Sequence, residues 1–60
     1  MAEYRLMQDG QPVVNVVAPD DDALREIRHY AAVYSQDGPV KIQLKTRGGR
    51  WANLTINPES

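Results

Sequence analysis

The fold is decided by the stretch APDDDALREIRHYAAVYSQDGP, residues 18–39, because a helical period stands here between two segments that have the period of strands. Apolar side chains in this stretch recur every three and four residues, which is the spacing of one buried stripe on an amphipathic helix. We predict a helix from about Asp21 to Gln36. The expected buried stripe consists of Ala23, Leu24, Ile27, Tyr30, Ala31 and Tyr34.

Signals at both ends of the stretch limit this helix. Pro19 interrupts the preceding segment. One acid of Asp20-Asp21-Asp22 is expected to cap free backbone N–H groups, while the others lie at the positive end of the helix dipole. Gly38 is able to adopt the left-handed conformation that ends helices, and Pro39 cannot continue one.

The segment before the helix predicts a strand, a turn and a second strand, because β-branched and aromatic residues flank Asp9-Gly10. A two-residue turn at Asp9-Gly10 would place Asn15 opposite Tyr4, on the apolar face. We therefore expect a three-residue loop, residues 9–11. The resulting pairs are Gln8 with Pro12, Leu6 with Val14, Arg5 with Asn15 and Tyr4 with Val16.

The segment after the helix alternates strictly between apolar and polar residues from Val40 to Lys45, which is typical of a strand covered on one face. A loop of Arg47-Gly48-Gly49 would pair Thr46 with Arg50. The inward pairs are then Leu44 with Ala52, Ile42 with Leu54 and Val40 with Ile56. The outer face would carry Lys41, Gln43, Lys45, Trp51, Asn53 and Thr55.

Together these segments predict an α+β domain of ββαββ architecture, in which one helix packs on one face of a four-stranded antiparallel sheet. One domain should span residues 1–57, and residues 58–60 should be a short polar tail. The order of the strands cannot be read from the sequence, because the helix allows the two hairpins to meet along more than one pair of edges.

Length and composition narrow the class of protein. A chain of 60 residues without cysteine has neither a disulfide framework nor a thiolate metal site, and its small core would gain stability from a dimer or a partner. The cytoplasm is the default location, since neither a signal peptide nor a membrane span is visible. Charge is polarised: residues 1–24 hold five acids and one arginine, whereas residues 40–56 hold four cations and no acid.

One helix covers only one face of a sheet, so the second face is the expected binding surface. It combines cations with Trp51, Met7, Val13 and Val17, a mixture common in recognition surfaces. The candidate binding residues are Trp51, Arg47, Arg50, Lys45, Lys41, Gln43, Asn53 and Arg5. In the competing interpretation, Trp51 lies over Lys45 in a cation–π contact and only stiffens the hairpin.

Catalytic and metal motifs are weak in comparison. Glu26 and His29 form half of a Glu-x-x-His metal pair without a second half, and Asp20-Asp21-Asp22 is better explained as helix-start chemistry. Arg47-Gly48-Gly49-Arg50 occurs once, in a turn, and so resembles a hairpin loop more than an RGG box. We expect no enzyme, no cofactor and no metal site.

The run from Ala23 to Tyr34, continued by residues 37–42 and Gly49-Arg50-Trp51, is similar in size and layout to small proteins of phages and mobile elements. Among these it resembles anti-CRISPR proteins, short inhibitors of RNA-guided defence complexes. The resemblance implies a protein that docks on a host protein or ribonucleoprotein complex and blocks it sterically. It assigns no individual residue, because such inhibitors share little sequence with one another.

Two alternatives remain open. The protein could bind nucleic acid directly, stacking bases on Trp51 and contacting phosphates with the basic hairpin, although its net charge is −1 and its pI about 5.6. It could instead form a homodimer through the uncovered face.

Overall fold

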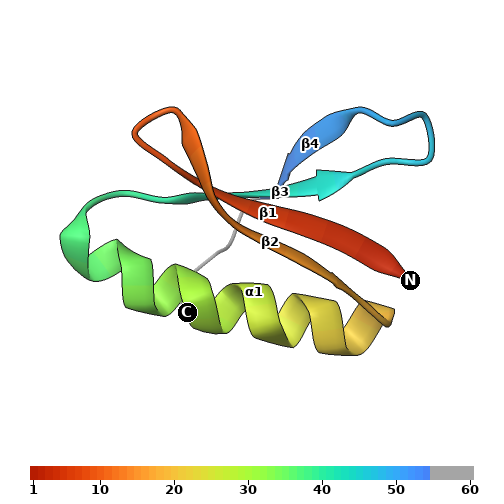
Figure 1. The fold of residues 1–60 in the computed structure, drawn as a ribbon, viewed down its shortest axis with the longest axis horizontal. Helices are drawn as coiled ribbons and strands as arrows, with labels where there is room; N and C mark the ends of the chain where they lie inside the picture. Colours follow the sequence, from red (N-terminus) through yellow and green to blue (C-terminus); the bar gives the residue numbers. More distant parts are fainter. Residues whose placement is uncertain (55–60) are drawn as a thin grey trace.

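The computed structural model describes residues 1–54 and confirms the ββαββ architecture (Figure 1). The four strands form one antiparallel sheet in the order β2-β1-β3-β4, so that β1 and β3 are central. The elements are β1 (Ala2–Gln8), β2 (Gln11–Ala18), α1 (Asp20–Tyr34), the 3-10 turn η1 (Ser35–Asp37), β3 (Lys41–Lys45) and β4 (Trp51–Leu54). The expected pair of Val40 with Ile56, the outward Thr55, the domain end at residue 57 and the tail at 58–60 lie outside the described residues.

The core explains why β3 pairs with β1. In this register Leu6 lies beside Ile42 and Tyr4 beside Leu44, so the apolar positions of both strands share the face toward α1. Leu6 and Ile27 are fully buried. The buried core consists of Tyr4, Leu6, Val16, Ala23, Ile27, Ala31 and Ile42.

The helix does not cover the whole sheet. It packs on β1 and β2 and only marginally on β3, and Figure 1 shows β4 as the strand farthest from it. Leu44 and Leu54 are therefore only half-buried, and Ala52 is exposed. The expected pairs of the second hairpin are correct within residues 1–54. Ala52 lies on the helix side, opposite Leu44, but it is exposed, because α1 does not reach β4.

The turn of the first hairpin differs from the expected three-residue loop. Gln8 pairs with Gln11, which leaves a two-residue turn of Asp9 and Gly10 with φ of 56° and 75°. Two successive residues with positive φ are typical of the turn whose twist matches that of the flanking strands, and Asp-Gly is a preferred sequence for it. The preference of Asp9-Gly10 for a two-residue turn therefore decides the turn, although such a turn alone would have placed Asn15 opposite Tyr4.

A β-bulge restores the register that the pairing argument required. Leu6 pairs with Val14 and Met7 with Pro12, so Val13 is an extra residue without a partner on β1. From Val14 onward every expected pair of this hairpin is confirmed. The bulge interrupts the in–out alternation of β2 at Val13. The expected position of Val13 on the uncovered face therefore no longer follows from alternation.

The second hairpin has the predicted three-residue loop. The Thr46 N–H donates to the Arg50 carbonyl at 2.7 Å, and the Gly49 N–H donates to the Thr46 carbonyl at 3.0 Å. Gly49 has a φ of 81°, a conformation that residues with a side chain rarely adopt. The register of Lys45 with Trp51 and of Gln43 with Asn53 follows from this closure.

The start of α1 corrects the expected cap. The helix begins at Asp20, one residue earlier than predicted, with Pro19 in the capping position and no side-chain hydrogen bond at that residue. The Ala23 N–H instead donates to the Pro19 carbonyl at 2.8 Å. The acids lie within the first turn, where they interact favourably with the helix dipole but do not act as the N-cap.

The end of α1 is held by a side chain from the first hairpin. The helix ends at Tyr34, earlier than the predicted Gln36, and continues as η1. The Gln8 side-chain amide donates to the Tyr34 carbonyl at 3.0 Å and to the Gly38 carbonyl at 3.4 Å. Gln8 thus satisfies the Tyr34 carbonyl, one of the groups that the end of a helix leaves without partners.

One member of the expected apolar stripe is exposed, and two, Leu24 and Tyr34, are half-buried. Ala23, Ile27 and Ala31 form the buried line of α1, whereas Tyr30 is 38% exposed. Helical spacing places Tyr30 on the flank of this line opposite Arg28, which lines the groove toward β3. Helical spacing correctly predicts which side of α1 is buried. The width of the buried stripe depends on how far the sheet extends beneath the helix.

Candidate functional site

The face of the sheet opposite α1 forms the candidate site, and we call it the open face. Strand alternation sets its members apart from the buried Tyr4, Leu6 and Ile42. Its described residues are Glu3, Arg5, Met7, Asn15, Val17, Lys41, Gln43, Lys45, Trp51 and Asn53. Within residues 1–54, the one helix packs on the other face and none covers this one.

A row of polar side chains crosses three strands of the open face. Arg5 pairs with Gln43, and Gln43 pairs with Asn53. Arg5 Nε donates to Gln43 Oε1 at 2.6 Å, and Gln43 Nε2 donates to Asn53 Oδ1 at 2.9 Å. The Gln43 amide is therefore held from both sides, which fixes the side chains of the row relative to one another.

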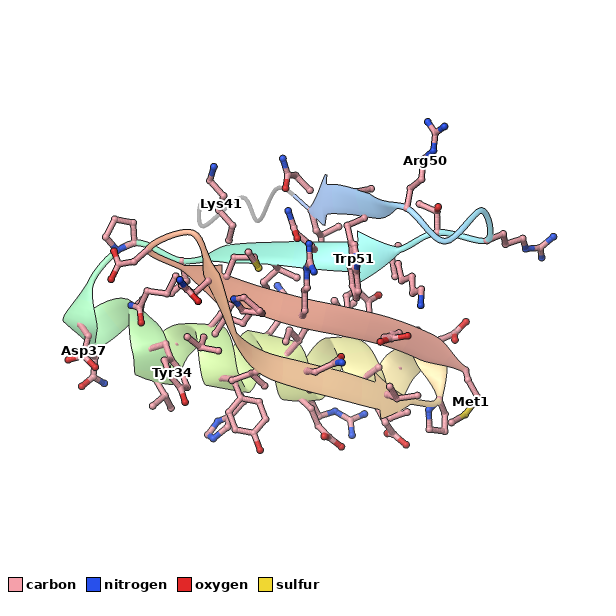
Figure 2. All side chains as sticks on the ribbon, turned by 45° about the horizontal axis from the view of Figure 1, so that its top comes forward. Met1, Tyr34, Asp37, Lys41, Arg50 and Trp51 are labelled. Atoms are coloured by element: carbon pink, nitrogen blue, oxygen red, sulfur yellow. The ribbon has the colours of Figure 1, made fainter. Side chains whose placement is uncertain are left out.

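Trp51 lies on the open face beside this row (Figure 2). The guanidinium carbon of Arg5 is 4.1 Å from the centroid of the indole ring, and Lys45 Nζ is 6.0 Å away. Both cations are within the range of a cation–π interaction. The nearer one is Arg5 of β1 and not the expected Lys45, because the strand order brings the first hairpin beside the second.

Glu3 is a member of the open face that sequence reasoning missed. Its carboxylate lies 3.7 Å from Lys45 Nζ and accepts a hydrogen bond from Asn15 Nδ2 at 3.3 Å. Alternation along β1 could have found it, since Glu3 precedes Arg5 by two residues. Glu3 partly neutralises a face on which Arg5, Lys41 and Lys45 are the cations.

The eight candidate binding residues do not all meet. Trp51, Arg5, Lys45, Gln43 and Asn53 form one connected cluster, which we call the Trp51 cluster. Lys41 lies on the same face, two residues along β3 from Gln43 and opposite Met7.

The two arginines of the hairpin tip lie apart from this cluster. Arg50 extends away from Trp51 (Figure 2), as alternation requires of its chain neighbour. Arg47 lies in the loop before it. Both remain predicted contact residues, but they belong to the hairpin tip and not to the Trp51 cluster.

The side chains of the Trp51 cluster are held in a fixed arrangement. Its polar groups already bond to one another, so the side chains are held in place before a partner arrives. A preorganised surface loses less conformational entropy on association than one that must be ordered. Trp and Arg are also the side chains most often found at the energetic centre of interfaces.

A groove of about 740 Å³ lies on the other side of the sheet, between α1 and β3. It exists because the helix does not reach β4. Its lining includes Ala31, Ala32, Val40 and Leu54. Leu54 is the last described residue, so residues 1–54 alone do not define the outer wall of this groove.

Comparisons with models of protein families, with curated proteins and with solved structures found no match. Within residues 1–54, the helix is too short and too polar to cross a membrane. In the same part of the chain, no three His, Cys, Asp or Glu side chains come together as metal ligands.

Proposed function

We propose that the protein is a non-catalytic binding protein that covers part of a macromolecular partner with its open face. One observation carries this proposal: Trp51 lies on the uncovered side of the sheet, stacked against Arg5 and surrounded by side chains that bond to one another. A large aromatic ring held in this way is an anchor that a partner can bury with little loss of entropy.

The charges of the open face favour an anionic partner. The open face carries three cations and one acid. The acids Asp20, Asp21 and Asp22 lie elsewhere, at the start of α1. Complementary charge guides association and excludes wrong partners more than it adds affinity. A ribonucleoprotein or an acidic protein surface fits this face.

The proposed partner is an RNA-guided defence complex in the host cytoplasm, the class that the resemblance to anti-CRISPR proteins implies. Steric blocking requires affinity and covered area, not chemistry. A standard interface takes about 800 Å² from each partner. The chain exposes 4431 Å², so one face is large enough to supply an interface of this size.

The test is equilibrium binding of the protein to a purified RNA-guided effector complex, with target-DNA binding as the second readout. Trp51→Ala should weaken binding about thirtyfold, the effect of losing roughly 2 kcal/mol at a central aromatic residue. Arg5→Ala should weaken it less.

Arg28→Ala serves as the matched control for charge, because Arg28 is exposed on α1, away from the open face. Wild-type affinity in Trp51→Ala would show that Trp51 does not anchor the interface. Failure of the wild-type protein to bind any such complex would show that the partner class is wrong.

Direct nucleic-acid binding is the second candidate, and the contact between Arg5 and Trp51 favours it. Sheet-face aromatic rings beside cations stack bases in several RNA- and single-strand-binding folds. A salt titration with single-stranded and duplex oligonucleotides tests this function, because phosphate contacts give an affinity that falls steeply with salt. Absence of binding at low salt would exclude it, while binding with a steep slope would replace the first proposal.

A further inference from the structure

The strand β2 lies at one edge of the sheet, and on its outer side no strand pairs with it within residues 1–54. Proteins usually protect such edges with charged residues, proline or bulges. In β2, Pro12 and the bulge at Val13 protect only the end next to the turn. The remaining residues, Val14–Ala18, contain no charge and no proline, although Val17 is 58% exposed.

The sequence of β2 is complementary to itself. Val13-Val14-Asn15-Val16-Val17 reads the same in both directions. Antiparallel pairing of two copies about Asn15 would place Val14 opposite Val16 of the second copy and Asn15 opposite Asn15. Opposite residues share a face, so valine meets valine beside the helices and amide meets amide on the open face.

The position of α1 fits the same pairing. The helix packs on β1 and β2 to a similar extent, so its axis lies about half a strand spacing inside β2. Strands are about 4.8 Å apart, and a twofold axis between two β2 strands would therefore set the helices roughly 10 Å apart. Packed helices lie about 8–10 Å apart. Continuing the sheet would therefore place the two helices next to each other on one face.

Two exposed apolar side chains lie on the flank of the helix that would meet the second copy. Arg28, Ala32 and Ser35 line the groove on the β3 side of α1. Helical spacing puts Tyr30 and Val33 on the opposite flank, toward the free edge of β2. They are 38% and 47% exposed, so both have apolar surface that a second copy could cover.

We infer that a second copy of this chain pairs antiparallel along β2, forming one eight-stranded sheet with both helices on the same side. The backbone groups of the edge would then bond across the twofold axis, and Tyr30 and Val33 would be buried between the helices. The inference is independent of the proposed function, because the dimer leaves both open faces uncovered, with the two Trp51 clusters far apart on one side of the sheet.

Sedimentation velocity over a range of concentrations tests the interface. The wild-type chain should approach twice its monomer mass of 6.8 kDa as concentration rises. Val33→Lys should weaken dimerisation at least about tenfold, because it places a charge between the helices. Ala32→Lys is the matched control: it adds the same charge at the next residue, on the other flank, and should leave the dimer intact.

Three results would overturn the inference. The first is a wild-type chain that stays monomeric up to the highest soluble concentration. The second is a dimer that Val33→Lys and Ala32→Lys weaken equally. The third is a dimer lost in Trp51→Ala but kept in Val33→Lys, which would place the contact on the open face.

Single cysteines test the register, since the natural chain contains none. Directly opposite Cα atoms in an antiparallel pair lie about 4.5–5.5 Å apart, within the range that a disulfide spans. Asn15→Cys should therefore form a disulfide-linked dimer rapidly on oxidation, at concentrations at which the wild-type chain is dimeric. Asn53→Cys, the same change on the open face of β4, should link only slowly. Equal rates for the two variants, or no linkage at Asn15→Cys, would contradict pairing along β2.

Discussion

The two hairpins have the same elements but different surroundings. In the first, β1 and β2 lie directly over α1, and Leu6 and Val16 are buried. In the second, β4 lies beyond the helix, Leu44 and Leu54 are half-buried and Ala52 is exposed. A helix of 15 residues covers the first hairpin but not the whole of the second. The first hairpin therefore contributes most of the core, while the second extends the polar and aromatic surface.

Side chains on the open face link the two hairpins. Arg5 of the first hairpin reaches Gln43 and Trp51 of the second. On the helix side, the junction of the hairpins is an apolar contact between Leu6 and Ile42. The two hairpins are thus joined by burial on one face and by a hydrogen bond and a cation–π contact on the other.

The largest expected difference between the hairpins comes from one substitution made in each. Leu6→Ala should lower the free energy of unfolding by about 3 kcal/mol, because it leaves a cavity in the core. Leu44→Ala, in a half-buried site, should lower it by about 1 kcal/mol, since less apolar surface is lost. Urea denaturation followed by circular dichroism measures both. Equal losses would mean that α1 covers the second hairpin as fully as the first.

A double-mutant cycle sharpens the account of how the hairpins are joined. Arg5→Ala and Trp51→Ala should each destabilise the fold by about 1 kcal/mol, with a coupling energy of about 0.5–1 kcal/mol from the cation–π contact. Lys41→Ala with Trp51→Ala is the matched cycle and should show no coupling, because Lys41 lies four residues along β3 from Lys45. Additive effects for Arg5 and Trp51 would show that the contact contributes no stability.

The smallest expected effect is the difference in stability between alanine substitutions at two neighbouring glycines of the second hairpin. Gly49→Ala should cost about 1 kcal/mol, because its φ of 81° is strained for alanine although no atom lies within 4 Å of an added Cβ. Gly48→Ala should change the free energy of unfolding by less than about 0.5 kcal/mol, since its added Cβ meets only Thr46 Oγ1 at an ordinary 3.9 Å. Thermal unfolding of the two variants side by side makes this measurement. A loss at Gly48 as large as that at Gly49 would contradict the loop geometry.

Sequence reasoning succeeded where a single element decides the outcome. Alternation from Val40 to Lys45 and a loop with Gly49 at the turn led to the correct register, because both are local properties of one hairpin. It failed at the first turn, where two local rules conflicted. The bulge at Val13 satisfies both rules, since it keeps Asp9-Gly10 as the turn and still returns Val14 to the face of the helix.

The candidate site was predicted in part for the same reason. The outward direction of Trp51 follows from the register of one hairpin and was predicted correctly within residues 1–54. Its nearest cation was not, because Arg5 belongs to a strand 46 residues earlier in the chain. The acid Glu3 was overlooked although alternation placed it on the same face.

The sequence by itself determined the elements, the face of each strand that is apolar and the outward position of the indole, because periodicity and turn chemistry act over a few residues. Only the tertiary structure decided the strand order, the overhang of β4 beyond the helix, the exposure of Tyr30 and the contact of Arg5 with Trp51. These features depend on which edges of the two hairpins meet over α1. That choice is made by the burial of Leu6 against Ile42, residues that no local pattern relates.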